Sequence, residues 1–464
     1  MFSKNTYTNR RNQLKKMVKT GVVLIPGNED APMNYADNTY HFRQDSTFLY
    51  FFGLDLQGLA GIIDIDNDRE VIFGDDYTLD DIVWMGPQPS LKDQAARVGI
   101  SETKPYRELA KEIDAAIKQR RNIHFTPPYR GENIMKLADL LNIHHREVKN
   151  HASLELTKAC IELRSIKEPC EIEEMERHMT VASKMHTTAM KMARPGISEQ
   201  EITGTLEGIS MSGGGIIAFP VICSVRGETL HNHYHGNILK EGDLLLVDAG
   251  SESPLHYATD HTRTTPVSGK LSDIQKQIYQ TVLSANDQAR EATKPGVSYR
   301  DVHLLACRVI ASGLKDMGLM KGDIDEAVAA GAHALFMPHG LGHMIGLDVH
   351  DMENYDDTLV GYDEEIERSS QFGLAALRLG RRLKPGFTIT NEPGIYFIPA
   401  LIDNWKAEKK FTQFINYHKV ESMKGFGGIR LEDDIVVTET SARILGERIP
   451  VTVEEIEQIA GKGV

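Results

Sequence analysis

Short apolar runs and one amphipathic stretch organise the first third of the chain. Residues 21–26, 59–65 and 71–73 are runs rich in Val, Ile, Leu and Phe, which predict buried strands. Residues 109–118 have apolar positions at helical spacing. The aromatic run at residues 41–53 is expected to pack in the core. This pattern predicts an α/β unit.

The composition changes near residue 157, where charged and apolar positions begin to alternate in a new pattern. Pro169 is followed by acidic residues, which is typical of a helix start because carboxylates suit the positive end of the helix dipole. We therefore predict a smaller N-terminal domain over residues 1–156 and a second domain over residues 157–464.

The second part of the chain contains an internal repeat. Arg194–Ile202 recurs as Lys294–Val302, and each copy joins one helical pattern to another. In each copy a serine precedes an acidic residue (Glu201 or Asp301) by three positions, which is a capping-box arrangement. A Pro-Gly-x-Ser turn can recur by coincidence, but the flanking helices and later strands favour a duplicated half-domain. A site between the halves would then lie near a pseudo-twofold axis.

Length and charge narrow the class of protein. The chain has 464 residues, 41% hydrophobic and 25% charged, as in soluble proteins of two or three domains. Its net charge of −14 argues against nucleic acid or an acidic membrane as a partner. No apolar run approaches a membrane span, and the basic N-terminus has no apolar core of a secretory signal. The four cysteines are scattered, which predicts buried free thiols in a reducing cytoplasm.

Residues 337–351 contain the densest group of candidate functional side chains. His339, His343 and His350 share this span with three glycines, which allow close approach of the backbone. The glycines argue against a long helix, so we expect a loop that runs into a strand. A lone histidine is usually structural, but three in such a run indicate a site.

Acidic residues end or interrupt several apolar strands. The run Leu244–Gly250 contains Asp248, and the returning segment 257–265 contains Asp260. A hairpin centred on Pro254 would set the two aspartates opposite each other, where they repel unless a positive group lies between them. Just upstream are three further histidines, His231, His233 and His235.

In the second half of the predicted duplicated domain, glutamates lie in apolar strands. Thr388, Thr390 and Glu392 alternate onto one face of a strand, and Arg430 and Glu432 do the same on another. A glutamate in an apolar strand costs several kcal/mol unless it is paired or binds a metal. For either glutamate alone, a salt bridge remains an equal alternative.

Two aspartates, two glutamates and a histidine form a hard, oxygen-rich donor set. Such donors fit Mn²⁺, Co²⁺ or Zn²⁺ and not copper or an iron–sulfur cluster. Four carboxylates suit two ions, and a metal pair about 3.5–4 Å apart can hold a bridging hydroxide nucleophile. The other histidines remain available for proton transfer. The residues alone therefore predict a two-metal hydrolase.

Seven segments in one order carry a resemblance to a known family. The chain resembles the aminopeptidase P and prolidase branch of the pita-bread metallopeptidases over essentially its whole length. The segments are Leu230-His, Leu246-Val-Asp-Ala-Gly, Thr259-Asp-His-Thr-Arg-Thr, His339-Gly-Leu-Gly-His, Asp348-Val-His-Asp, Asn391-Glu-Pro-Gly-Ile-Tyr and Ile429-Arg-Leu-Glu-Asp-Asp. The resemblance implies an α/β (α+β) protein in which a C-terminal pita-bread catalytic domain follows a smaller N-terminal domain.

The resemblance also implies roles for individual residues. Glu392 would be a metal ligand that also carries a proton to the leaving nitrogen, and Arg430 would steady Glu432. His231, His339 and His350 would hold the substrate and the developing oxyanion, while His233 and His235 would only line the entrance. The implied metal ligands are Asp248, Asp260, His343, Glu392 and Glu432, with Asp248 and Glu432 as bridges.

The chain departs from the family pattern at two places. The two aspartates are twelve residues apart, one more than expected, so the hairpin tip should bulge. Phe219 stands near the position at which many relatives carry a tyrosine. One hydrogen bond beside the metal ligands is therefore in doubt.

The implied reaction is hydrolysis of the bond between an N-terminal residue and proline, with two divalent ions, preferably Mn²⁺. The main hypothesis is an Xaa-Pro aminopeptidase, and the alternative is an Xaa-Pro dipeptidase. Arg378 matches the prolidase arginine that binds a dipeptide's carboxylate, unless it is simply solvated. Trp84 matches a tryptophan that reaches a neighbouring subunit's active site, which predicts a homodimer or higher homo-oligomer, unless it is interior to its own domain.

Two rival hypotheses are weaker. Methionine aminopeptidase has the same metal ligands but lacks a leading domain of this length and the Glu392-Pro-Gly-Ile-Tyr setting. A metal-free pita-bread binding protein would have lost ligands, whereas all five ligand positions are present here.

Overall fold

The computed structural model describes residues 1–463, which form two compact units. The N-terminal unit comprises Met1–Arg164 with Met352–Leu359, and the C-terminal unit comprises Ser165–Asp351 with the chain from Val360 onward. The domain boundary predicted after residue 156 falls inside α7 (Leu154–Ser165), because this helix runs without a break through the change in composition.

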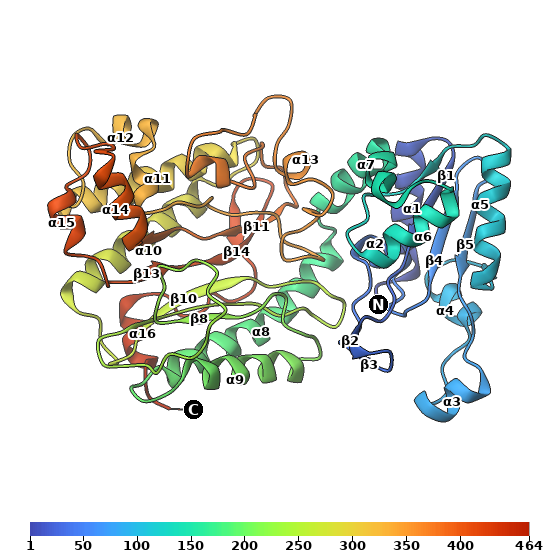
Figure 1. Cartoon of the computed structure of the whole chain (residues 1–464), viewed down its shortest axis with the longest axis horizontal. Helices are drawn as coiled ribbons and strands as arrows, with labels where there is room; N and C mark the ends of the chain where they lie inside the picture. The colour runs from blue at the N-terminus through green and yellow to red at the C-terminus, as the bar shows by residue number, and fades with distance from the viewer. Residues whose placement is uncertain (464) are drawn as a thin grey trace. The chain divides into compact units, whose positions relative to one another are not determined.

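A five-stranded sheet with the order β6-β5-β4-β1-β7 forms the centre of the N-terminal unit (Figure 1). The predicted strands are confirmed as β1, β4 and β5. The strands are β1 (Val22–Pro26), β4 (Ala60–Asp64), β5 (Arg69–Phe73), β6 (Glu102–Lys104) and β7 (Ile123–His124).

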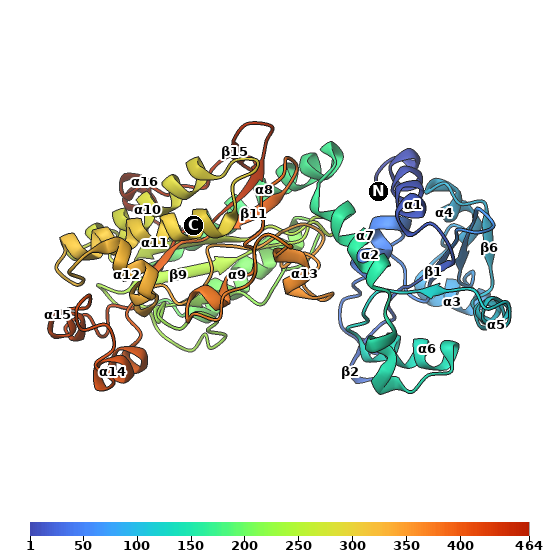
Figure 2. The ribbon, with the colours of Figure 1, turned by 90° about the horizontal axis from the view of Figure 1, so that it is seen from above.

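Helices cover both faces of this sheet, with α1 (Lys4–Val18) on one side and α6 on the other (Figure 2). One face packs against α5 (Leu109–Lys118), the predicted helix, and α6 (Gly131–Leu141). The other face packs against α2 (Ser46–Phe52), whose residues are all buried, so the aromatic run is core as expected. A Cβ on Gly61 of β4 would lie 2.1 Å from Cζ of Phe52, so this helix requires glycine at that position.

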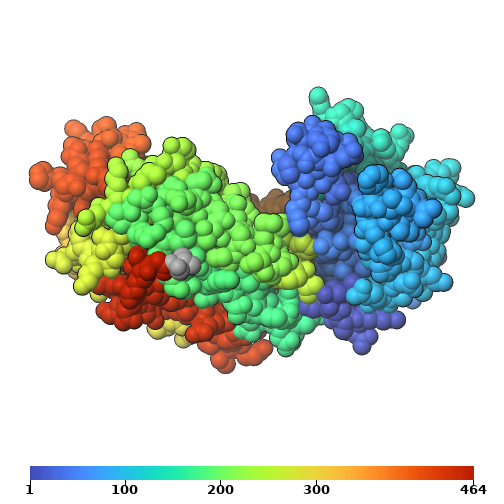
Figure 3. Space-filling view, turned by 90° about the horizontal axis from the view of Figure 1, so that it is seen from below, coloured from blue at the N-terminus to red at the C-terminus, as the bar shows by residue number. Residues whose placement is uncertain are grey.

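One helix of the N-terminal unit lies outside its core. Helix α3 (Leu79–Met85) has a capping box formed by Thr78 and Asp81, and it contains no buried residue. The hairpin of β2 (Pro32–Tyr35) and β3 (Asn38–Thr39) is also at the surface, and Figure 3 shows both segments on one face of this unit.

Two helix pairs of the C-terminal unit follow the internal repeat. The first copy joins α8 (Pro169–Met192) to α9 (Glu199–Ser212), and the second joins α10 (Asp273–Ala292) to α11 (Tyr299–Asp316). Ser198 caps α9 in a full capping box with Glu201, whereas Ser298 only accepts a bond from the Asp301 N–H. The two helix starts are therefore equivalent in backbone but not in every side-chain bond.

The turns between the paired helices bind later segments in the same way. The N–H of Gly196 donates to the Leu239 carbonyl (2.9 Å), and the Leu239 N–H donates to Ile197 (2.8 Å). In the second copy Leu383 makes the same pair of bonds with the residues at 296 and 297, both at 2.9 Å. The predicted duplication of a half-domain is confirmed by this shared backbone pattern.

The strands of the two halves meet in the centre of the unit, between the helix pairs in the view of Figure 1. The first half forms the sheet β10-β9-β8, the second forms β11-β14-β15, and β12 pairs with β13. The Glu432 N–H donates to the Thr262 carbonyl (3.1 Å) and joins the halves. The strands are β8 (Ile222–Ser224), β9 (Leu244–Ala249), β10 (His261–Pro266), β11 (Thr388–Asn391), β12 (Gly394–Tyr396), β13 (Gly428–Arg430), β14 (Asp433–Val437) and β15 (Ala442–Ile444).

Shorter helices complete the chain. Every helix within residues 1–463 is either too short or too polar to cross a lipid bilayer. The remaining helices are α1 (Lys4–Val18), α4 (Leu91–Arg97), α12 (Ile324–Ala330), α13 (Asp357–Gly361), α14 (Pro399–Ala407), α15 (Tyr417–Glu421), α16 (Val453–Ile459) and the 3₁₀ turns η1 (Tyr106–Glu108), η2 (His145–His151), η3 (Ala332–Leu335) and η4 (Leu374–Ala376).

Asn286 on α10 ties together two strand ends that carry acidic residues. Its side-chain amide is buried and donates to the carbonyls of Asn391 (2.9 Å) and Leu431 (3.1 Å). Its own oxygen accepts from Arg448 (2.9 Å). Since the two carbonyls directly precede Glu392 and Glu432, this one side chain sets the spacing of both glutamates.

Replacing Asn286 should therefore destabilise the fold. Asn286→Ala leaves buried groups without partners, which predicts a loss of about 2–4 kcal/mol in the free energy of unfolding, measured by urea denaturation. Asn404→Ala removes an exposed bond to Glu408 and should change stability by no more than about 0.5 kcal/mol. Equal effects of the two substitutions would contradict the role of Asn286.

Candidate active site

A cavity of about 600 Å³ in the C-terminal unit contains nearly all of the predicted site residues. Of the eleven, only Trp84 is not among its lining residues; it belongs to α3 and is 80% exposed. The ten that line the cavity are His231, Asp248, Asp260, His339, His343, His350, Arg378, Glu392, Arg430 and Glu432.

The acidic residues come from equivalent places in the two halves. Asp248 lies on β9, nine residues after Leu239, and Glu392 directly follows β11, nine residues after Leu383. Leu239 and Leu383 are the residues that pair with the two repeat turns. The duplication therefore supplies one carboxylate of this kind from each half.

The aspartate hairpin differs from the prediction in its register. Asp248 pairs with Thr262, not with Asp260, and the turn is centred on Leu255, not on Pro254. Asp260 precedes Thr262 by two residues, so it still points to the same face of the sheet as Asp248. The face was therefore predicted correctly and the partner wrongly.

The tip of this hairpin contains the expected bulge. His256 adopts a left-handed conformation (φ 66°), and its N–H donates to the Ser253 carbonyl (2.8 Å). The Ser253 N–H in turn donates to the Tyr257 carbonyl (2.8 Å). This is a three-residue loop in which the last residue forms a bulge, so the tip takes up the additional residue.

The histidine-rich segment is a loop, and the strand expected after it is reduced to one bridge between Met344 and Ile389. A Cβ on Gly342 would lie 2.1 Å from the Thr390 carbonyl oxygen. The absence of a side chain lets His343 bond Thr390 twice, through its N–H to Oγ1 (3.1 Å) and its carbonyl to the Thr390 N–H (3.0 Å). The close approach sets the position of His343.

Asp260, His343 and Glu432 form a group of potential metal ligands in the cavity. One donor atom from each lies within 4.8 Å of the other two. Nε2 of His343 is 3.4 Å from Oδ2 of Asp260 and 3.7 Å from Oε1 of Glu392. Nδ1 of His343 donates to the Met344 carbonyl (3.0 Å), which leaves the Nε2 lone pair facing the acids.

The electrostatics of the cavity favour a bound cation. Oδ1 of Asp248 and Oδ1 of Asp260 are buried and accept no hydrogen bond from residues 1–463. Burial and then the Asp248 carboxylate raise the pKa of Asp260 well above its usual range, and burial and Asp260 do the same to the pKa of Glu432. A divalent ion would stabilise the ionised forms. Hard oxygen donors with one imidazole therefore fit such an ion.

Arg430 connects the acids to a residue that the sequence interpretation missed. Nη2 donates to Oδ2 of Asp248 (2.6 Å), Nη1 to the Tyr396 hydroxyl (2.8 Å) and Nε to Oγ1 of Thr262 (3.0 Å). Thr262 in turn donates to Oε2 of Glu432 (2.6 Å). Tyr396 lies four residues after Glu392 at the end of the same motif, which was the available signal.

Tyr396 also positions His339. Nδ1 of His339 donates to the Gly340 carbonyl (2.7 Å), so its Nε2 accepts from the Tyr396 hydroxyl (3.0 Å). Burial, and then the charge of Arg430, lower the pKa of His339 to about 3. The ring is therefore neutral near pH 7, with a defined tautomer.

Other histidines lie near the mouth or behind the ligands. His231 and His233 are exposed lining residues, whereas His235 bonds the Val221 carbonyl (3.0 Å) and has a structural contact. The His350 ring centroid is 4.2 Å from that of His343, and burial, followed by His343, lowers the pKa of His350 to about 2.

Two further residues, Arg378 and Phe219, line the same cavity. Arg378 is half-buried, and its charge acts on His231, His350 and Glu392. Phe219 also lines the cavity, where its ring offers no hydroxyl for a hydrogen bond.

Comparisons with known proteins agree with this site. Residues 173–439 match metallopeptidase family M24, and residues 7–124 match the aminopeptidase P N-terminal domain. Human Xaa-Pro dipeptidase is 32% identical over 449 residues, which cover 94% of this chain and 88% of the human protein.

Two solved structures are similar over both domains. Pseudomonas aeruginosa aminopeptidase PepP has a TM-score of 0.80 at 28% identity, and zinc-substituted Escherichia coli aminopeptidase P in complex with product has 0.79 at 27%. Each alignment covers 99% of this chain and 98% of the other. The predicted fold class is confirmed. The chain belongs to metallopeptidase family M24, with an aminopeptidase P N-terminal domain before a pita-bread catalytic domain.

Proposed function

We propose that this metallopeptidase is an Xaa-Pro aminopeptidase, which removes the N-terminal residue that precedes proline in a peptide. The observation that carries the proposal is the cavity in which Asp260, His343 and Glu432 converge beside Asp248 and Glu392. The similar Pseudomonas and Escherichia structures are aminopeptidases. The second candidate is an Xaa-Pro dipeptidase, which the human relative and the position of Arg378 favour.

Two divalent ions, preferably Mn²⁺ with Co²⁺ or Zn²⁺ as alternatives, would occupy this donor set. Asp248, Asp260, His343, Glu392 and Glu432 would hold them. When bound, the ions supply Lewis-acid polarisation of the scissile carbonyl and activation of the attacking water. Four carboxylates around one imidazole support two ions because they exceed what one ion requires.

The protein's own groups would orient the peptide and move protons. The peptide bond before proline has a tertiary amide nitrogen, so this nitrogen must gain a proton as it leaves. Glu392 suits this step because its side chain is 18% exposed, compared with 12% for Asp248 and 7% for Asp260. Arg430 and Tyr396 would hold the geometry around it.

Neutral imidazoles would stabilise the oxygen that becomes negative during attack. His231, His339 and His350 all line the cavity. His231 and His350 would donate N–H groups to this oxygen, whereas His339, whose ring nitrogens bond the Gly340 carbonyl and the Tyr396 hydroxyl, would help to hold the substrate. The bond from Tyr396 holds the ring orientation of His339 before substrate arrives. Such preorganisation reduces the reorganisation required in the transition state.

Metal dependence is the first expected outcome. Chelation should abolish activity and Mn²⁺ should restore it, and Asp260→Asn should lose one ion and nearly all turnover. The fall should exceed the about 10–100-fold loss seen when a group that only orients a ligand is removed. Metal content is measured by mass spectrometry alongside turnover.

Asp323→Asn serves as the control for that variant. Asp323 is the N-cap of α12, where asparagine caps equally well, so metal content and rate should stay unchanged. A fully active metal-free preparation would refute the proposal, and a protein that takes up no Mn²⁺ and shows no peptidase activity in its presence would favour the binding-protein hypothesis.

The preference for dipeptide over tripeptide substrates should depend on Arg378. An arginine–carboxylate pair contributes about 1.5–3 kcal/mol, which corresponds to about 10–160-fold in kcat/KM. Arg378→Ala should therefore impair an Xaa-Pro dipeptide far more than an Xaa-Pro-Xaa tripeptide. Rates for both peptides are compared in wild type, in this variant and in Arg382→Ala, whose side chain is 53% exposed and pairs with Glu365. Equal losses on both peptides would assign Arg378 to structure.

We also propose that the protein is a homodimer or higher homo-oligomer. The α3 patch, formed by Leu79, Val83, Trp84 and Met85, is 53–80% exposed at each residue. The alternative of an interior Trp84 is therefore wrong. A cluster of large apolar side chains on the surface is typical of an interaction site. In the assembly Trp84 would cover the bound proline in a neighbouring subunit's cavity and exclude water.

Trp84→Ala should then raise KM by about 2–10-fold, as expected for one aromatic contact, without loss of metal. Kinetics, metal analysis and sedimentation are compared with Met135→Ala, a 52% exposed apolar residue on α6 of the same unit. A fully active wild-type monomer would refute the assembly.

A cytoplasmic location belongs to the same proposal. Cys160, Cys223 and Cys307 are buried free thiols, and Cys170 is half-buried. Free thiols without disulfides are typical of a reducing compartment.

A further inference from the structure

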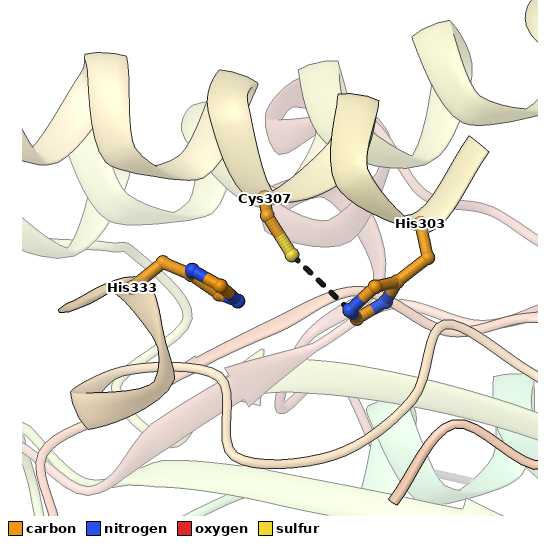
Figure 4. Close-up of side chains that lie close together, drawn as sticks. All are labelled: His303, Cys307 and His333. Carbon is orange, nitrogen blue, oxygen red and sulfur yellow. Dashed lines mark hydrogen bonds between the residues drawn. The ribbon is translucent and has the colours of Figure 1, made fainter. Parts of the chain in front are cut away.

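A second group of donors lies in the C-terminal unit, away from the acids of the active site. His303 and Cys307 stand four residues apart on α11, so they occupy the same helix face one turn apart. His333 projects toward them from η3, and Figure 4 shows the three side chains converging. Each of the three residues is at most 1% exposed.

The spacing of the donor atoms matches that of ligands around one ion. Sγ of Cys307 is 3.4 Å from Nε2 of His303, and one donor from each residue lies within 4.8 Å of the other two. A sulfur and a nitrogen bound to one zinc-sized ion at ordinary bond lengths are about 3.5–3.8 Å apart. Small side-chain rotations would therefore bring all three donors to one ion.

Three of the four ring nitrogens in this group lack a well-formed hydrogen bond within residues 1–463. Neither ring nitrogen of His333 nor Nδ1 of His303 makes a hydrogen bond of standard geometry with residues 1–463. An unpartnered buried polar group costs about 1–3 kcal/mol. A bound ion would provide partners for these nitrogens, which the packed core does not.

Both imidazoles carry lone pairs under ordinary conditions. Burial, followed by the His333 ring, lowers the pKa of His303 to about 3. Burial lowers the pKa of His333 to about 4, although the Val328 carbonyl acts in the opposite direction. Neutral rings are the form that binds metals.

We propose that His303, Cys307 and His333 bind one thiophilic d¹⁰ ion, Zn²⁺ or Cu⁺, at a site distinct from the active site. One sulfur and two imidazole nitrogens are soft donors, and no carboxylate belongs to the described group, so Mn²⁺ and Ca²⁺ do not fit. On binding, the Cys307 thiol releases its proton to solvent and its sulfur bonds the ion. Each imidazole donates one nitrogen lone pair, and no electron is transferred.

The bound ion would fasten α11 to the segment that leads into the active site. The His333 carbonyl accepts from the N–H groups of Phe336 (2.9 Å) and Met337 (3.1 Å), which lie three and two residues before His339. Ligation of His333 would therefore stabilise the backbone that positions His339.

Thiolate-to-metal charge transfer provides a test independent of peptidase activity. The full-length protein is first loaded with Mn²⁺, then titrated with Cd²⁺ as the zinc analogue, with Zn²⁺, or anaerobically with Cu⁺. The active-site donors include no sulfur, so a near-ultraviolet thiolate band that saturates at one equivalent of Cd²⁺ or Cu⁺ is expected from the new site alone. Equilibrium competition against a chelator then shows which of Zn²⁺ and Cu⁺ the site prefers.

Variants assign the band to its ligands. Cys307→Ser should abolish it, and His333→Gln, which keeps the thiol, should weaken binding at least tenfold while circular dichroism confirms folding. Cys223→Ser is the matched control, because Cys223 is equally buried but lies in the apolar cluster with Leu245 and Val247. The thiolate band of this variant should persist. Absence of a band in wild type with all three ions, or a band that survives Cys307→Ser, would overturn the proposal.

Discussion

Repulsion among buried carboxylates is the constraint on which the C-terminal unit depends. Asp260 and Glu432 have pKa values raised by burial and by neighbouring acids, so each opposes ionisation of the other. The fold holds them together through contacts made by neutral and cationic neighbours. Arg430 forms an ion pair with Asp248, and Thr262 donates to Glu432, so residues of two strands position these two acids. Without a cation, the ionised carboxylates would repel one another. A bound cation would attract each of them, so this group of acids favours binding of a positive ion.

Duplication explains how one chain gathers so many acids in one place. A single half-domain carries its carboxylate at the end of one central strand, as Asp248 shows for β9 and Glu392 for the region after β11. Neither half alone forms the cluster, because the bridge between Thr262 and Glu432 brings the halves together. Asn286 adds a link from a helix to the second half's strand ends. The active site is therefore a property of the junction between the copies.

The sequence was most informative where periodicity decides burial and least where a contact depends on register. Helix α5 begins and ends where its amphipathic spacing predicted. The period of two gave the correct face for Asp248 and Asp260 but not their partners, because a two-residue shift preserves the face. The turn at His256 sets that register through local backbone conformation. No pattern along the chain could show that the Tyr396 hydroxyl would join Arg430, because that contact depends on the pairing of β12 with β13.

Donors of different softness are separated by secondary structure in this unit. The oxygen-rich group lies on strand ends and adjoining loops, where alternation brings acids from several strands to one face. The sulfur and nitrogen group lies on a helix and a 3₁₀ turn, where the four-residue spacing of His303 and Cys307 aligns two donors. Metal preference follows the chemistry of the donors. A hard ion would therefore bind the oxygen-rich group and a thiophilic ion the sulfur and nitrogen group. The loop with His339 connects His333 to the oxygen-rich donors. A bound ion that held His333 in place would therefore also restrict the position of His339 in the cavity.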